Sequence, residues 1–197
     1  MIILIRHGQS TTNALGLLVG RSDPELTELG EGQARALRPY LRNVREVWTS
    51  PLSRARATAA LAMPDLEVRV NESFIEVDYG HLDGQPLSVV TAEEWQIFET
   101  DHRHALGDGE SLASVDERVH SVLDVLLADS ASLLHDRAND LAIVSHVSPI
   151  KSAMAWALGV PGSVAWRSRL DNGSITTISV RRRSPALVHF NLVPPTW

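Results

Sequence analysis

Two histidines and two arginines stand where the pattern of the chain predicts the ends of buried strands. His7 follows Arg6 directly after an apolar run, His146 follows another apolar run, and Arg54 lies in the first turn expected of a helix. Ligand sites in open α/β sheets form outside the carboxyl ends of the strands, so these four side chains are expected to converge on one pocket. Each alone has an ordinary structural explanation. Their conjunction at equivalent strand ends is what indicates a functional site.

This set of side chains suits phosphoryl transfer. Guanidinium groups are planar, permanently charged and able to donate two hydrogen bonds at once, which matches phosphate oxygens. A neutral histidine can attack phosphorus, and a second one can donate a hydrogen bond to the transferring group. A leaving alcohol needs a proton, so a carboxylic acid is expected near the pocket mouth. This chemistry requires no metal and no cofactor.

The elements that must position these residues alternate along the chain. Strands are predicted at residues 2–5, 46–49, 67–70 and 141–144, with an adjacent strand pair at 174–180 and 186–192. Helices are predicted behind the N-cap Thr27, from Pro51 to about Met63, from Ser111 to about Leu134, and from about Pro149 to Leu158, closed by Gly159. This order favours an α/β sandwich around a mostly parallel sheet. No linker divides the chain, so residues 1–197 are expected to form a single domain.

Composition places the chain among soluble globular proteins. It has 197 residues, 44% hydrophobic and 21% charged, which argues against disorder. The formal net charge of −6 disfavours nucleic acid or an anionic membrane as a partner. The absence of cysteine excludes disulfides, thiolate nucleophiles and zinc–thiolate sites. No apolar run approaches the ~18 residues of a membrane span, and the start is too short before its first charge for a signal peptide, so a cytoplasmic protein is expected.

The basic residues are almost all arginine. Of the 18 lysines and arginines, only Lys151 is a lysine, and we attribute this bias to GC-rich coding rather than to function. The run Arg181-Arg182-Arg183 is interpreted as a solvated turn between two strands.

Several motifs carry a family resemblance. Arg6-His7-Gly8-Gln9-Ser10, followed by Asn13, resembles the R-H-G-x-[ST]-x-x-N signature of the histidine phosphatase superfamily, the phosphoglycerate-mutase-like proteins. Further segments match in the same order, across roughly residues 2 to 180: Gly20–Asp23, Leu26–Ala34, Ser50–Ala59, Glu76–Gly80, Gly109–Ser111 and Val144–His146. R-H-G alone is a weak signal, whereas this ordered set is highly specific.

The resemblance implies a fold and a set of roles. The fold would be a three-layer α/β/α sandwich with a mostly parallel central sheet, phosphoglycerate mutase-like. His7 would be the nucleophile that forms a phosphohistidine, and Glu76 the general acid for the leaving group, then the base for the attacking water. Asp78, Asp83 and Glu110 are nearby in sequence and are left open as alternative acids. Arg6, Arg54 and His146 would complete the catalytic phosphate pocket, and the substrate-binding residues would further include Asn13, Gly20, Arg21 and Val147.

Three departures from the family pattern concern substrate choice. The run from His146 to Lys151 resembles acid phosphatase and α-ribazole phosphatase-like domains rather than the usual H-G-G. Asp83 stands where the G-x-x-E-G pattern has Glu. The stretch from about Leu87 to Asp108 matches no motif, and this lid region is expected to shape the substrate site.

The leading function is therefore a metal-independent phosphomonoesterase acting on a small phosphorylated metabolite. One alternative is a phosphoglycerate mutase-type phosphotransferase, but such mutases carry basic residues after the acid motif, and this stretch contains only Arg103. Another is a non-catalytic phosphate-binding module, although no pocket residue is missing. A third is a metal enzyme built on His102 and His104, for which a surface loop is the favoured interpretation. Sugar phosphates, phosphoglycolate-like acids, α-ribazole phosphate and nucleotides all remain candidate substrates, and a homodimer is left open.

Overall fold

Strand β1 (Ile2–Arg6) lies inside a six-stranded sheet of order β3-β2-β4-β1-β5-β6. The computed structural model describes residues 1–128, 140–180 and 184–195. The strands β1, β2 (Val44–Thr49), β3 (Val68–Val70) and β4 (Asp140–Ser145) run parallel to one another. Strand β5 (Ile175–Ser179) is antiparallel to β1, and β6 (Ala186–Leu192) is antiparallel to β5. The mostly parallel sheet and the terminal strand pair predicted above are confirmed.

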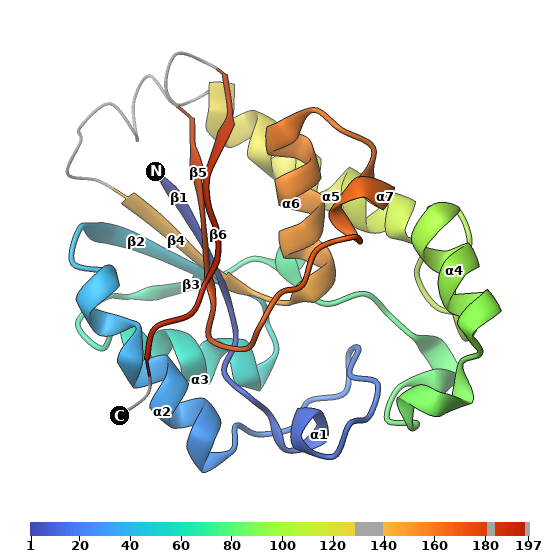
Figure 1. The fold of residues 1–197 in the computed structure, drawn as a ribbon. Coiled ribbons are helices and arrows are strands. Elements are labelled where there is room, and N and C mark those ends of the chain that lie inside the picture. The colour runs from blue at the N-terminus through green and yellow to red at the C-terminus, as the bar shows by residue number, and fades with distance from the viewer. Residues whose placement is uncertain (129–139, 181–183, 196–197) are drawn as a thin grey trace.

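Helices cover both faces of this sheet, because β1 is apolar on both sides. Ile2 and Leu4 belong to the core beneath α5 (Leu112–Ala128) and α6 (Val147–Leu158). Ile3 and Ile5 point the other way, into the core beneath α2 (Glu28–Ala36) and α3 (Ser53–Ala62). Figure 1 shows the two pairs of helices on opposite sides of the sheet. The three-layer α/β/α sandwich is confirmed.

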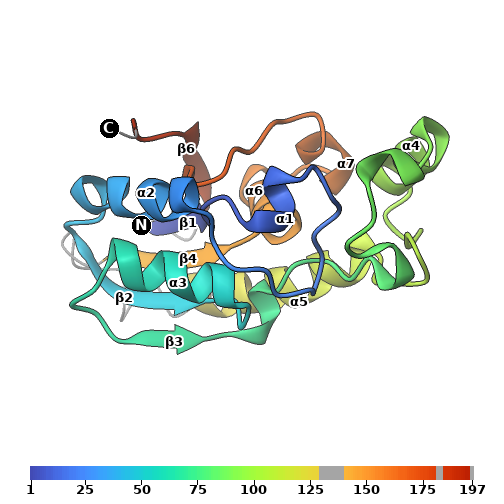
Figure 2. The ribbon, with the colours of Figure 1, turned by 90° about the horizontal axis from the view of Figure 1, so that it is seen from below.

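The lid region contains a helix that stands apart from the sandwich. Helix α4 (Ala92–Thr100) projects at one end of the molecule, beyond the small helix α7 (Gly162–Ala165), in both views (Figures 1 and 2). It is anchored by Phe98, whose ring centroid lies 6.1 Å from that of Tyr79 and 5.7 Å from that of Trp166. The remaining short elements are α1 (Thr11–Ala14) and the 3₁₀ turns Arg38–Tyr40, Glu72–Phe74, Gly80–Leu82 and Leu87–Val89.

Helix starts were predicted with mixed success. Thr27 caps α2 as expected, since its hydroxyl accepts a hydrogen bond from the Gly30 N–H at 3.0 Å. Helix α3 begins at Ser53 rather than at Pro51. The reason is Asp23, whose Oδ1 accepts the Ser53 N–H at 2.7 Å and its hydroxyl at 2.8 Å, so a distant carboxylate supplies the cap.

The start of one other helix also differs from the prediction. Helix α6 begins at Val147, two residues before Pro149, and ends at Gly159 in the left-handed conformation (φ 63°), as predicted. The expected continuation of α5 to Leu134 lies outside the described residues, as does the run Arg181–Arg183. In the described part of the chain, no helix has both the length and the apolar character needed to cross a membrane.

Candidate active site

The carboxyl ends of three parallel strands bring the predicted residues together. Arg6 of β1 pairs in register with Ser145 of β4, so His7 and His146 follow their strands at the same level of the sheet. Their ring centroids are 5.0 Å apart. Beside them, β2 ends at Thr49, in register with Val144, and the chain continues through Ser50 into α3. The convergence expected from the sequence is thus observed in the geometry.

His7 is held as a neutral imidazole whose Nε2 is unprotonated. Its side chain is buried, and Nδ1 lies 2.7 Å from the carbonyl oxygen of Gly8, which can only accept, so Nδ1 carries the proton. Burial lowers the pKa of His7 well below its usual 6.5, and the charges of Arg54 and Arg6 lower it further. The lone pair is therefore on Nε2, which lies 3.3 Å from Arg54 Nε. This is the state that a nitrogen nucleophile requires.

His146 is also neutral, and one of its ring nitrogens lacks a hydrogen-bond partner among the described residues. Its Nε2 lies 2.7 Å from the hydroxyl oxygen of Ser50, and burial followed by the charge of Arg54 lowers the pKa of the ring well below its usual value. Nδ1 is buried and has no hydrogen-bond partner among the described residues. If the Ser50 hydroxyl donates to Nε2, the ring proton sits on Nδ1. A ligand oxygen could then accept it.

Arg54 is fully buried, and three acceptors occupy part of its guanidinium. Nε donates to His7 Nε2, Nη1 to the Ser22 carbonyl at 2.6 Å, and Nη2 to the Gly20 carbonyl at 2.7 Å. Five N–H groups are available in all, so two remain for a ligand. From the sequence, the Arg54 guanidinium was expected to bind phosphate oxygens. The structure shows in addition that Arg54 connects the loop at Gly20 to the nucleophile.

The same loop is held from its other side by Asp83. Its Oδ1 accepts the Gly20 N–H at 2.9 Å and the Ser22 hydroxyl at 2.8 Å, and its Oδ2 accepts the Ser22 N–H at 2.6 Å. The shorter Asp at this motif position therefore acts through backbone contacts. Sequence reasoning noted the replacement but had no signal for the contact, because it joins segments that are 61 and 63 residues apart.

Arg6 points one donor at the protein and leaves another without a partner. Nη1 donates to the Leu170 carbonyl at 2.6 Å. Nε is buried and has no hydrogen-bond partner among the described residues. Together with His146 Nδ1, it is a buried polar atom that a bound ligand could satisfy.

Glu76 lies deeper than the pocket mouth where an acid was expected. It is 4% exposed, and both carboxylate oxygens accept backbone N–H groups: Oε1 from Val77 at 2.9 Å and from Ser148 at 3.1 Å, Oε2 from Val147 at 3.0 Å. Two of these donors open helix α6, whose positive end favours a carboxylate. The Val147 N–H, predicted to bind substrate, is thus given to Glu76 in this state.

Asn13 supports the nucleophile loop. Its Oδ1 accepts the Ser10 N–H at 3.1 Å and the Asn172 side-chain amide at 3.3 Å, and the same Asn172 amide donates to the His7 carbonyl at 3.2 Å. Asn172 was not identified from the sequence, since it lies 165 residues from His7.

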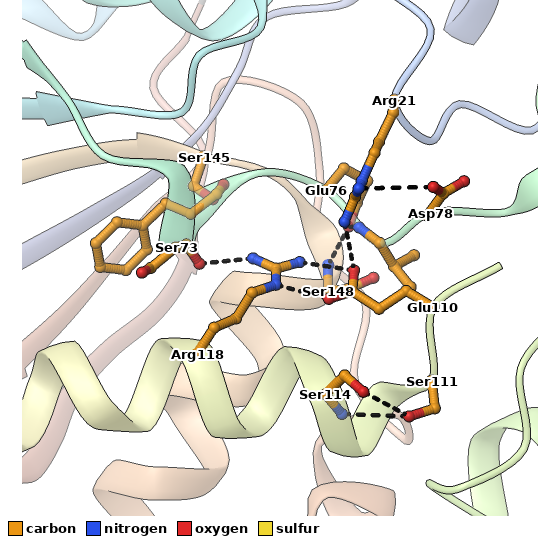
Figure 3. Close-up of polar contacts among 12 residues, drawn as sticks. Arg21, Ser73, Glu76, Asp78, Glu110, Ser111, Ser114, Arg118, Ser145 and Ser148 are labelled. Carbon is orange, nitrogen blue, oxygen red and sulfur yellow. Dashed lines mark hydrogen bonds and ion pairs between the residues drawn. The ribbon is translucent and has the colours of Figure 1, made fainter.

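Arg21 forms ion pairs with two carboxylates, one of them on the acid-motif loop. Figure 3 shows it between Asp78 and Glu110, with ion-pair distances of 3.6 and 3.3 Å. Glu110 is fixed in turn by Arg118, at 2.9 and 3.1 Å, and Arg118 also donates to the Ser73 carbonyl at 2.6 Å. In this state Arg21 is therefore bound by two carboxylates, and its expected role in substrate binding stays a prediction.

The proposed metal alternative finds little support in the side-chain arrangement. His102 Nδ1 lies 3.1 Å from Asp116, and its ring packs near Gly162 rather than against His104. Across the described residues, no group of three or more His, Asp or Glu side chains is arranged to hold a metal ion.

The chain is similar to known proteins over almost its whole length. The family model of the histidine phosphatase superfamily (branch 1) matches residues 2–193. Phosphoserine phosphatase 1 of Hydrogenobacter thermophilus is 30% identical over 199 residues, which cover 97% of this chain and 92% of that protein. The adenosylcobalamin/α-ribazole phosphatase of Salmonella typhi is 31% identical over 186 residues, covering 90% and 89%. Among solved structures, the phosphoserine phosphatase of Entamoeba histolytica in complex with 3-phosphoglyceric acid aligns with a TM-score of 0.84 at 29% identity, covering 96% of this chain and 95% of that one.

Proposed function

The chain belongs to the histidine phosphatase superfamily (branch 1) and is a phosphatase, and we propose that its one domain hydrolyses small phosphate monoesters without a metal, with His7 as the nucleophile. The observation that carries this assignment is the state of His7. It is a buried neutral imidazole whose unprotonated Nε2 faces Arg54 and lies next to a second neutral histidine. A phosphoryl group placed there meets the lone pair on one side and cationic donors on the others.

The first step forms the phosphohistidine. His7 Nε2 attacks phosphorus, the P–O bond to the alcohol breaks, and the leaving oxygen takes a proton from Glu76. Arg6, Arg54 and His146 Nδ1 donate to the phosphoryl oxygens while the charge develops.

The second step restores the enzyme. Water attacks phosphorus, the P–N bond breaks, and Glu76 takes the proton from the water as it adds. Inorganic phosphate leaves, and His7 returns to the neutral state with its lone pair on Nε2. Atoms and charges balance without an added metal or cofactor.

We further propose an acid phosphatase-type pH dependence. Both histidines have pKa values well below 6.5, so they stay neutral as the medium becomes acidic. A nucleophile that needs its lone pair therefore remains active in mild acid, where an ordinary histidine is protonated.

The test is to trap the intermediate. With ³²P-labelled ester and rapid quenching, the wild-type chain should carry one phosphate in a bond that survives alkali and is lost in acid, and His7→Ala should neither carry the label nor release phosphate. The thermal unfolding midpoint of His7→Ala serves as the folding control. An acid-stable label, or undiminished turnover by His7→Ala, contradicts the mechanism. With 3-phosphoglycerate, free phosphate without 2-phosphoglycerate is expected, whereas isomerisation would favour the mutase alternative.

A further inference from the structure

The only lysine of the chain lies beside the site and is not used by the mechanism above. Lys151 is 6% exposed and stands on α6, the helix whose first N–H groups bind Glu76. Residues three and four positions apart share one face of a helix, which places Lys151 on the same face as Val147 and Ser148. Side chains on a helix lean toward its N-terminus, so the Lys151 side chain extends toward the phosphate site.

The ammonium group has an aromatic neighbour but no anionic partner. Nζ lies 4.2 Å from the centroid of the Trp166 ring. Among the described residues, no carboxylate forms an ion pair with it; Glu99 and Glu76 act on it only from a distance. Burial lowers the pKa of Lys151 to about 8, with Arg6 lowering it further and the two carboxylates opposing this shift. A buried charge without a counter-ion is costly, which fits a position that a ligand anion completes.

A second buried polar group lies one helical turn away. The hydroxyl of Ser148 is buried, and among the described residues the phenol of Tyr79 is the side chain that interacts with it, without well-formed hydrogen-bond geometry. Burial raises the pKa of Tyr79, so its hydroxyl keeps its proton. An ammonium and a hydroxyl three residues apart on one helix face match the two oxygens of a carboxylate.

We propose that Lys151 and Ser148 bind a carboxylate of the substrate, so that the ester is a small phosphorylated carboxylic acid rather than a nucleoside or sugar phosphate. This inference rests on the proposed function and adds the substrate class. The Trp166 ring lies against the Lys151 ammonium, and Phe98 of helix α4 contacts both Trp166 and Tyr79. Lys151 and Ser148 follow His146 on the first turns of α6, so a carboxylate bound there is expected to lie close to the phosphate.

Arg103 is the rival cation. It lies in the stretch after the acid motif and was the only basic residue found there, but its side chain is exposed. An exposed arginine is screened by water and salt, so it is expected to contribute little to selectivity between two small esters.

Two matched pairs of esters, which differ only in the carboxylate, test the proposal. O-phosphoserine is compared with O-phosphoethanolamine, and 3-phosphoglycerate with 2-hydroxyethyl phosphate, by phosphate release from wild type, Lys151→Met, Lys151→Arg and the control Arg103→Met. Wild type should prefer the carboxylated ester of each pair. Lys151→Met should lower kcat/KM for the carboxylated esters about 10- to 100-fold, because one charge-assisted hydrogen bond is lost. The change should be mainly in KM, since this hydrogen bond stabilises the bound substrate and the transition state equally. The decarboxylated esters should change less than about 2-fold, and Arg103→Met should keep the wild-type preference.

The possible failures are distinguishable. If Lys151→Met slows both members of each pair equally, Lys151 is structural and the proposal is wrong. If wild type releases phosphate from both members at equal rates, no carboxylate subsite exists. If wild type releases phosphate from no ester, including p-nitrophenyl phosphate, it is the proposed function that fails. Thermal unfolding and the near-ultraviolet signal of the tryptophans, Trp166 among them, show whether Lys151→Met is folded. If it is not, Lys151→Arg decides, because it keeps the charge and should keep the preference for the carboxylated ester. Complete loss of this preference, with unchanged turnover of the decarboxylated esters, would contradict binding through charge.

Discussion

Replacing Glu76 by Gln removes a proton carrier and also reverses one hydrogen bond at the start of α6. The carboxylate accepts three N–H groups, two on Oε1 and one on Oε2. The Gln oxygen can take the place of Oε1, but its NH₂ group then faces the Val147 N–H, donor against donor. A buried donor left without a partner costs about 1–3 kcal/mol, so the free energy of unfolding should fall by that amount.

The loss of the proton adds a kinetic effect that can be separated from the loss of stability. General acid catalysis contributes roughly 10²–10⁴-fold when the leaving group is a poor one. An alkoxide needs the proton, whereas p-nitrophenolate leaves readily without it. Glu76→Gln should therefore slow hydrolysis of alkyl phosphates by about 10²–10⁴-fold, and slow that of p-nitrophenyl phosphate much less. The disturbed hydrogen bond affects both esters alike.

The assay is kcat/KM for both kinds of ester, together with the thermal unfolding midpoint. The midpoint should fall by roughly 2–12 °C, from about 2–4 °C per kcal/mol for a chain of this size. Asp78→Asn and Asp83→Asn are the matched carboxylate controls. Equal slowing of both esters by Glu76→Gln, or leaving-group dependence in an aspartate variant alone, would refute Glu76 as the acid.

Three further predictions follow from the same geometry. Arg54→Lys keeps the charge but offers one nitrogen for three acceptors, so kcat/KM should fall about 10- to 100-fold; wild-type kinetics would place Arg54 outside the reaction. Because the pKa of His7 lies below 6.5, its ring should keep the NMR shifts of a neutral imidazole as the pH is lowered through 6.5, and a midpoint at or above that value would contradict the assignment. The pKa of Lys151 is about 8; Glu99 and Glu76 raise it and Arg6 lowers it. The preference in kcat/KM for phosphoserine over phosphoethanolamine should therefore decline as the pH rises through 8 and the ammonium loses its proton. A preference that stays constant to pH 9.5, about 1.5 pH units higher, would contradict the role of charge.

The sequence analysis succeeded where local pattern decides the structure. Apolar runs such as Ile2–Ile5 and Leu141–Val144 became strands buried on both faces, because nothing but burial from both sides suits them. Thr27 caps its helix through a residue three positions away, within the reach of a local rule. The polar residues at the strand ends converge because parallel strands end at one edge.

It failed where a distant residue decides. Proline rules placed helix starts at Pro51 and Pro149, yet Asp23 caps one helix at Ser53, and Glu76 binds the N–H groups that open the other at Val147. These carboxylates lie 30 and 71 residues away from their helices, so no local window contains them. Lys151 was likewise assigned to coding bias, because its burial against Trp166 arises only when the chain is folded.

The position of β1 in the sheet sets the order in which this enzyme can be assembled. The strand that carries the nucleophile is made before both of its neighbours, β4 and β5, which come from beyond residue 139. While the ribosome synthesises the chain, the apolar segment Ile2–Ile5 therefore has no partner strand until β4 and β5 have emerged. Pairing across so long a sequence separation closes a large loop and is slow. Nascent chains that lack these strands should expose β1 to chaperones and to aggregation, and His7 should become reactive only after β4 and β5 have been synthesised.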